Sequence, residues 1–324
     1  MKFITRLLLL IVFLLGCTHN EKPTVTYATW TGIGPDKWAS AWLISYHLEP
    51  GANIQFVETK KPILNATAFD VPIAKYKRTS EHTTYESLVA DFNNTDPVLN
   101  ELAIIVRDIE IFGWGGKENP ASHYIETAFR GLQLHFGREK VPDNCYYLLF
   151  ENAYRLLKNH QGEDYRYFEN ELALNPQCAN IRTKPTIDDD KYVAEWNTYE
   201  ILNFINSGKK IAFIDTREAD EFQEGHIPGA INIKLRDLDK KLPLEISNAD
   251  VVIPYCVKDF RGFEVAKTLK LQGINTVGLM NPYGIAGWKK VGLPIAGPKA
   301  LPEKQATQQL YDCAEKPEEC IKNG

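Results

Sequence analysis

The sequence lacks an excess of basic residues, and it lacks the spacings typical of metal ligands. Its 37 lysine and arginine residues are outnumbered by 42 aspartate and glutamate residues, which gives a formal net charge of −5 at pH 7. Domains that bind nucleic acid usually present a basic face, so we expect no nucleic-acid partner. Neither a His-x-x-x-His nor a Cys-x-x-Cys pair occurs, and this absence weighs against a metal site.

The chain also shows no internal repeat, and no low-complexity tract outside its C-terminal tail. With 44% hydrophobic and 24% charged residues, its composition is typical of globular domains and not of disordered or fibrous proteins. At about 150 residues per domain, its 324 residues predict two domains.

The chain begins with the pattern of an export signal. Lys2 and Arg6 precede the apolar run Leu7–Leu15, which is long enough for a signal peptide but too short to cross a bilayer comfortably. The sequence Leu-Leu-Gly-Cys at residues 14–17 resembles the lipobox of bacterial lipoproteins. The resemblance implies cleavage before Cys17 and acylation of its thiol. An uncleaved anchor and an ordinary secretory peptide are the alternatives, and all three export the chain.

Lipidation would place the protein on the periplasmic side of a bacterial membrane, anchored through Cys17. In many bacteria an aspartate after the lipidated cysteine retains lipoproteins in the inner membrane. This chain has Thr18 there, so the outer membrane is slightly favoured. Removal of the signal peptide, residues 1–16, changes the formal charge to −7, with 35 basic against 42 acidic residues.

Cysteine usage points to an oxidising compartment, where disulfides persist. With Cys17 assigned to lipid and Cys256 to a loop described below, four of the six cysteines remain, and four cysteines allow three pairings. We prefer Cys313–Cys320, which would close a short tail, and Cys145–Cys178, which would clamp a linker to the first domain. Four free thiols are the alternative.

A first, helix-rich α+β domain is predicted over residues 25–158. Apolar residues recur at three- and four-residue steps in a helix that begins at Pro35 and in a second helix that follows an Asp96 N-cap. The residues expected to be buried on these two helices are Trp38, Ala39, Trp42, Leu43, Tyr46, Leu99, Leu102, Ile105, Val106 and Ile109. The other predicted elements are a helix over Tyr146–Leu157 and strands over Asn53–Glu58 and Phe69–Ile73.

The pattern changes after a polar linker, residues 159–191. Over residues 192–298, short apolar runs alternate with helical patterns, which predicts an α/β domain with a parallel sheet covered by helices on both faces. A polar tail, residues 299–324, follows. Pro254 lies inside a predicted strand, where it costs a ladder hydrogen bond, and we interpret it as a bulge. The predicted strands are Ile211–Ile214, Val251–Tyr255 and Thr276–Met280, and the helices are Trp196–Ile205 and Phe263–Leu271.

We predict a nucleophile at Cys256, which follows the strand Val251–Tyr255; a buried core thiol is the alternative. Ligands of open parallel sheets bind beyond the carboxyl ends of the strands, and the amides and dipole of the next helix favour an anion there. Because Lys258 and Arg261 add positive charge, we expect the thiol pKa to fall below its usual value of about 8.5. Asp259 opposes this effect and is expected to point outward. The substrate-binding loop is Val257, Lys258, Asp259, Phe260 and Arg261.

Three separated motifs resemble a rhodanese domain over about residues 192–297. The resemblance implies that Cys256 accepts sulfur as a persulfide, in a loop that cradles an anionic donor. Asp215, Arg217 and His226 match supporting positions, and we favour a structural ion pair for the first two and a turn hydrogen bond for His226. The motifs are IDTREADEFQEGHIPGAINI at 214–233, VVIPYCVKDFRG at 251–262 and GWKKVGLPI at 287–295.

Loop length narrows the chemistry. Related phosphatases of this fold place five residues between cysteine and arginine, whereas four residues separate Cys256 from Arg261. The shorter loop favours a sulfur atom over a phosphate. We expect the thiolate to attack the outer sulfur of a donor such as thiosulfate, and the persulfide to pass to a thiol or to cyanide. Loop amides and Lys258 would hold the departing anion. No cofactor is expected.

Four segments of the first domain resemble the chromate-resistance domain, which also forms the C-terminal part of chromate-responsive regulators. They lie at residues 28–58, 69–72, 82–88 and 96–110. The resemblance implies a part in chromate or related oxyanion stress. The polar residues that we single out are Lys37, Asp70, His82 and Asp108, each with a surface or capping role as the alternative. A less favoured metal site would combine His123 and Glu126 with His47 or His82.

Two further hypotheses stay open. Because Asp259 lies inside the loop, the protein could be an oxyanion-binding or sensing module without turnover. Alternatively, Cys256 could donate electrons to chromate.

Overall fold

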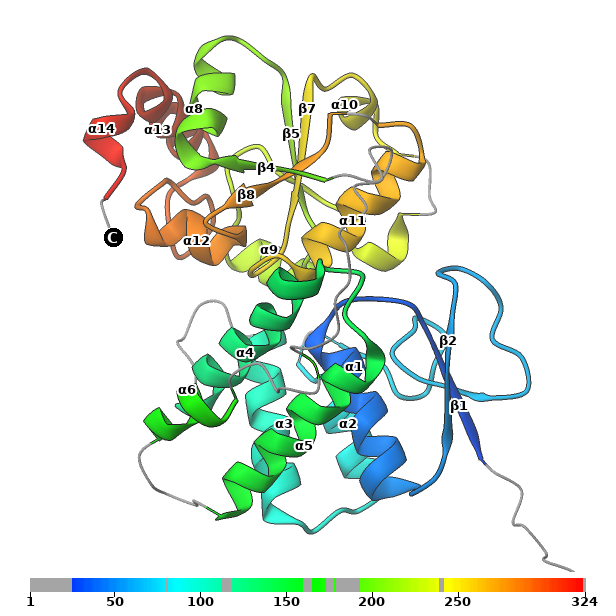
Figure 1. Ribbon diagram of the computed structural model, residues 1–324. Helices are drawn as coiled ribbons and strands as arrows, with labels where there is room; N and C mark the ends of the chain where they lie inside the picture. Colours follow the sequence, from blue (N-terminus) through cyan, green and yellow to red (C-terminus); the bar gives the residue numbers. More distant parts are fainter. Residues whose placement is uncertain are drawn as a thin grey trace, which may run out of the picture.

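The computed structural model describes residues 25–79, 81–111, 118–159, 165–172, 178, 193–238, 242–274 and 276–322. The predicted signal peptide and Cys17 lie outside these residues, as does most of the linker. Within the described part of the chain, no helix combines the length and the apolar character needed to cross a membrane. Figure 1 shows two bodies that meet where β7 ends and α11 begins.

The first domain packs a bundle of helices against a small parallel sheet with strand order β2-β1-β3. The prediction of a helix-rich α+β domain is confirmed. The strands are β1 (Thr26–Trp30), β2 (Asn53–Val57) and β3 (Thr67–Ala68). The helices are α1 (Pro35–Leu43), its π-helical continuation η1 (Ile44–Leu48), α2 (Thr84–Asp91), α3 (Pro97–Glu110), α4 (Ala121–Phe136), α5 (Asp143–Asn159), η2 (Tyr165–Tyr167) and α6 (Phe168–Glu171).

Helix α3 follows the sequence closely. The Asp96 side chain accepts a hydrogen bond from the Val98 backbone N–H, as an N-cap should, and the five apolar residues expected to face the core are all buried. Two predictions in this domain are wrong. Tyr46 is 52% exposed, because the π-helical turn shifts it away from the buried stripe of α1. Phe69–Ile73 is not a strand, since pairing with β1 ends at Ala68.

The second domain has the predicted α/β architecture. Parallel strands pair in the orders β4-β8 and β6-β5-β7, and a parallel bridge between Val252 and Val277 joins the two sets. The strands are β4 (Ala194–Asn197), β5 (Ile211–Asp215), β6 (Ile231–Asn232), β7 (Val251–Tyr255) and β8 (Gly278–Asn281). The helices are α8 (Thr198–Asn206), α9 (Ala219–Glu224), η4 (Leu235–Asp237), α10 (Leu244–Ser247), α11 (Phe260–Leu271) and α12 (Gly284–Lys290).

Strand β7 is straight through Pro254, so the predicted bulge is wrong. Its register with β5 continues from Ile211–Val251 to Asp215–Tyr255 without an extra residue. On its other side, the bridge between Val252 and Val277 is the one pairing of β7 among the described residues, so no ladder there requires an N–H from residue 254. The proline therefore lies within β7 without interrupting its register with β5.

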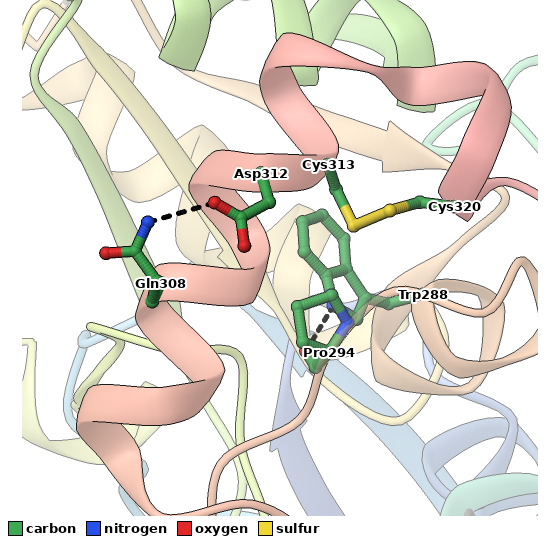
Figure 2. The surroundings of a disulfide bond; sticks show 6 residues. All are labelled: Trp288, Pro294, Gln308, Asp312, Cys313 and Cys320. Carbon is green, nitrogen blue, oxygen red and sulfur yellow. Dashed lines mark hydrogen bonds between the residues drawn. A yellow bond between two sulfur atoms is a disulfide. The ribbon is translucent and has the colours of Figure 1, made fainter.

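The C-terminal tail is folded onto the second domain. Helix α13 (Glu303–Glu315) buries Ala306, Leu310 and Cys313, and α14 (Pro317–Cys320) follows it. Both predicted cysteine pairs are disulfides, Cys145–Cys178 and Cys313–Cys320. Figure 2 shows the second disulfide beside Trp288, whose indole N–H donates to the carbonyl of Pro294.

Candidate active site

Cys256 lies at the carboxyl end of β7, and the loop that follows it leads into α11. Helix α12 is bound to the start of this loop by two backbone hydrogen bonds. The backbone N–H of Ile285 donates to the Cys256 carbonyl at 2.9 Å, and that of Ala286 donates to the Val257 carbonyl at 3.0 Å. Gly284 makes the approach possible, because it has φ +62° and an added Cβ would lie within 2.6 Å of the Cys256 carbonyl oxygen.

The positive side chain and the backbone N–H groups expected around the Cys256 thiol are both present. The Arg261 guanidinium and the backbone N–H groups of Gly262 and Lys258 favour the thiolate. Cys256 is however only 3% exposed, and burial raises its pKa above the ordinary value, with Asp259 adding to the rise. The expected fall in pKa is therefore wrong for this conformation, because desolvation outweighs the loop's charge and dipoles.

The first domain covers the loop. Four of its residues contact that domain: Lys258 pairs with Glu126, Asp259 with Arg130 and Arg138, Phe260 packs edge-to-face on Phe129, and Arg261 donates to the Glu110 carbonyl at 3.3 Å. Two expectations are corrected by these contacts. The Asp259 side chain does not point outward, since it is 1% exposed, and the Lys258 ammonium is engaged by a carboxylate instead of facing a leaving group.

Two arginines of the first domain bracket the Asp259 carboxylate. Arg130 Nη1 lies 2.5 Å from Oδ1, and Arg138 Nη1 contacts Oδ2. Both guanidinium groups also lie over the Tyr283 ring, at 5.6 and 5.2 Å from its centroid. Arg138 bonds in addition to Glu195 at 3.0 Å. The loop's acidic residue is thus neutralised by Arg130 on α4 and Arg138 in the turn after it, both more than 100 residues away in the sequence.

The supporting residues of the second domain have structural positions. Asp215 and Arg217 are fully buried and form a bidentate pair, with 2.6 Å between Arg217 Nη2 and Asp215 Oδ2. His226 stacks on Phe222 and lies 2.9 Å from both the Phe222 carbonyl and the Glu303 carboxylate. These contacts agree with the favoured roles of ion pair and turn hydrogen bond.

In the first domain, the structure brings two of the four candidates together. Lys37 Nζ lies 2.5 Å from Asp70 Oδ2 and 3.1 Å from Thr29 Oγ1, and Asp70 accepts a second hydrogen bond from Thr84. Burial alone would lower the Lys37 pKa, but the carboxylates of Asp70 and Glu264 raise it. Lys37 is therefore a buried cation that the carboxylates of Asp70 and Glu264 stabilise.

The other two candidates stand apart from this pair. His82 has a side chain that is 60% exposed, 3.9 Å from Glu86. Asp108 is buried and accepts hydrogen bonds from the N–H groups of Glu118 and Asn119 and from the Ser122 hydroxyl, so it caps the segment that enters α4. Both positions match the surface and capping roles given above as alternatives.

The proposed metal ligands are dispersed. His47 packs against Trp42 and Tyr154, and Glu126 pairs with Lys258 and Arg130. No cluster of three or more His, Cys, Asp or Glu side chains able to hold a metal ion occurs in the described ranges.

A buried group of acids at the domain boundary was not predicted from the sequence. The Asp36 carboxylate accepts hydrogen bonds from the N–H groups of Thr84 and Tyr85, and Glu110 accepts from Asp36 N and pairs with Arg78 at 2.5 Å. Burial, Asp70 and Glu110 raise the pKa of Asp36 to about 7. One member of this group, Glu110, accepts a hydrogen bond from Arg261 through its backbone carbonyl.

The sequence held one clue to these contacts. Asp259 sits where an uncompensated carboxylate would oppose the thiolate, and such a residue requires cationic partners from elsewhere in the chain. Nothing in the local pattern of α4 or of the turn after it identifies Arg130 and Arg138 as those partners, since each alone has the pattern of a surface charge.

Comparison with known families agrees with this two-part structure. Residues 27–156 match the family model of the ChrB C-terminal domain, and residues 198–291 match that of the rhodanese-like domain. The chain therefore contains a ChrB C-terminal domain followed by a rhodanese-like domain. The order agrees with the two resemblances in the sequence, and Cys256 with its loop lies inside the region matched to the rhodanese-like domain.

Three relatives from Bacillus subtilis (strain 168) show the extent of the similarity. The uncharacterized protein YqhL is 37% identical over 92 residues, which are 28% of this chain and 68% of YqhL. The candidate sulfurtransferase YtwF is 29% identical over 97 residues, 30% of this chain and 91% of YtwF. The candidate sulfur carrier protein YrkF is 30% identical over 84 residues, which are 26% of this chain. This chain therefore spans less than half the length of YrkF, 44%. The rhodanese-like domain and these relatives support a function of the sulfurtransferase type.

Proposed function

We propose that the protein transfers sulfane sulfur from a small anionic donor such as thiosulfate, through a persulfide on Cys256, to a thiol or to cyanide. The observation that carries this proposal is the arrangement around the sulfur. Arg261 and the backbone N–H groups of Lys258 and Gly262 act on a single cysteine at the end of a central strand. That set of donors can stabilise a negatively charged sulfur once the loop is accessible.

The reaction has two steps. The Cys256 thiolate attacks the outer sulfur of thiosulfate, a Cys–S bond forms, the donor's S–S bond breaks, and sulfite leaves with the electron pair. An acceptor thiolate or cyanide then attacks the terminal sulfur of the persulfide, and the Cys256 thiolate is regenerated. Because the thiol is buried and its pKa is raised, the loop must become accessible before the first step.

The cellular setting that we propose rests on Cys17, on the two disulfides and on the first domain. Lipid on Cys17 would anchor the mature protein on the periplasmic side of the membrane, an oxidising place that suits the two disulfides. The match to the ChrB C-terminal domain supports a link to chromate or a related oxyanion. Chromate and thiosulfate are both tetrahedral dianions.

Thiocyanate production from thiosulfate and cyanide tests the activity on the mature protein. We expect turnover that is lost in Cys256→Ser and retained in Asp312→Ala, which changes an exposed aspartate on α13. Equal thiocyanate production by wild type and Cys256→Ser would remove the proposal.

The closed loop favours a second candidate function, oxyanion binding without turnover. Asp259 fills the arginine pair, and Cys256 is covered. Calorimetry that shows tight oxyanion binding by a protein inactive with thiosulfate and cyanide would select this function.

A further inference from the structure

We propose that Arg130 and Arg138 of the first domain form a binding site for the oxyanion end of the sulfur donor, and that Asp259 occupies this site in the resting protein. The inference rests on the proposed function and assigns part of the donor site to the ChrB C-terminal domain. Two arginines that each donate to a different oxygen of one carboxylate can do the same for a sulfonate or sulfate group, whose oxygens are similarly spaced.

The arginines are held in place without Asp259. Arg130 Nε bonds to Glu126 at 2.9 Å, and Arg138 Nη2 bonds to Glu195 at 3.0 Å. The faces of Phe260 and Phe263 lie 4.5 and 5.3 Å from the two guanidinium groups. The donors therefore keep their positions when the Asp259 carboxylate is withdrawn, which is the condition for a preorganised anion site.

The charge balance changes in favour of an anion when Asp259 leaves. With Asp259 present, the paired groups are Arg130, Arg138 and Lys258 against Asp259, Glu126 and Glu195. Without its carboxylate, one positive charge is uncompensated. Arg130 Nη2 is also buried without a hydrogen-bond partner in the described part of the structure, so one further donor is available.

The two arginine side chains are more exposed than the thiol, and the Asp259 carboxylate between them is 1% exposed. The side chains of Arg130 and Arg138 are 21% and 17% exposed, whereas Cys256 is 3% exposed. Asp259 is the residue immediately before α11, so rotation of its side chain withdraws the carboxylate without moving the helix. An anionic donor that displaces Asp259 thus weakens the contacts between the first domain and the loop.

Calorimetric titration with sulfate at constant ionic strength tests this site. Sulfate carries no transferable sulfane sulfur, so the result is independent of Cys256 chemistry. We expect Asp259→Ala to bind sulfate at least about tenfold more tightly than wild type, since the vacated pair recruits an anion. The double variant Asp259→Ala with Arg138→Gln should lose this gain. Asp312→Ala, which removes an exposed carboxylate elsewhere, should bind as wild type does.

Absence of a gain in folded Asp259→Ala, or a gain that persists in the double variant, overturns the site. If circular dichroism shows that Asp259→Ala is unfolded, Asp259→Asn, which keeps the side-chain volume, is titrated under the same criterion. Sulfur loading of wild type is measured separately. Loading without the sulfate gain removes only this inference, and the sulfate gain without loading removes only the proposed activity.

Discussion

The Glu264 carboxylate accepts a hydrogen bond of 3.0 Å from the backbone N–H of Ile33, which joins helix α11 of the rhodanese-like domain to the first domain. Gly32 permits this approach, because an added Cβ would lie 2.6 Å from Glu264 Oε1. Glu264 lies three residues after Arg261, which is about one turn of helix α11. The helix that begins at the reactive loop is therefore fastened to the first domain by its own side chain.

This contact predicts how stability depends on pH. Burial raises the pKa of Glu264 to about 7, with Asp70 and Glu110 adding to the rise. The folded protein then binds more protons than the unfolded chain, so this contribution to stability is present at low pH and is lost as pH rises towards about 7. Glu264→Gln removes it, and the unfolding free energy should then fall less steeply with pH.

Urea unfolding of wild type and Glu264→Gln at several pH values measures the difference. For one such group the slopes should differ by no more than about 1.4 kcal/mol per pH unit. Glutamine retains an acceptor for the Ile33 N–H, so the change isolates the titration. Parallel curves for the two proteins would contradict the assignment.

The Cys256 thiol should react with iodoacetamide slowly at neutral pH and faster in alkaline solution. Burial raises its pKa, and the Asp259 carboxylate raises it further. Asp259→Asn removes the second cause and leaves the charges of Arg130 and Arg138 unbalanced, so the midpoint of the pH–rate profile should move to lower pH. Alkylation rates measured by mass spectrometry check this, and a midpoint that moves upward or stays fixed counts against it.

Opening of the domain boundary should expose the thiol. Arg138→Ala removes the contacts of Arg138 with Asp259 and Glu195, and loss of such a pair costs roughly 3–5 kcal/mol when it is buried. We expect alkylation of Cys256 at fixed pH to become at least about tenfold faster, which corresponds to 1.4 kcal/mol of easier opening. Asp259, which keeps Arg130 as its partner, would by itself slow the reaction, because the loss of one positive neighbour raises the thiol pKa.

A faster alkylation of Cys256 in Arg138→Ala therefore identifies opening of the domain boundary and not a change in the ionisation of the thiol. The matched control is Arg155→Ala on α5, whose side chain is exposed and bonds to Asn152. A rate for Arg138→Ala no higher than that of the control would show that the first domain does not limit access.

The Asp215–Arg217 pair should act on stability. Both side chains are 0% exposed, and Asp215→Ala leaves the guanidinium buried beside the Gly225 carbonyl. We expect a loss of about 3–5 kcal/mol of unfolding free energy, measured by urea denaturation. Asp312→Ala should stay within about 0.5 kcal/mol of wild type. A stable Asp215→Ala protein that has lost only sulfur transfer would give Asp215 a direct chemical role instead.

The sequence predicted the second domain well, because its elements are encoded locally. Val251–Tyr255 is an apolar run bounded by polar residues, and β7 has those bounds. Gly273, two residues after the end of α11, has φ +90°, a conformation that favours glycine. Trp288, in the Gly-Trp pattern, is 2% exposed. Each of these features depends on neighbours in the sequence and needs no knowledge of the other domain.

The loop's environment could not be predicted in the same way. The expected low thiol pKa followed from charges within six residues of Cys256, and those charges are present. The result is reversed by burial and by Asp259, while Asp259 itself is held by arginines 121 and 129 residues away. Such contacts depend on how two domains pack, which neither hydrophobic period nor motif spacing encodes.

The most direct test of the account is the mass of the Cys256 peptide after the protein has been treated with thiosulfate and separated from it. Wild type should gain the mass of one sulfur atom on Cys256, reversible by cyanide, and Cys256→Ser should gain none. An unchanged mass in wild type, or the same addition in Cys256→Ser, would contradict the claim that this cysteine carries sulfur.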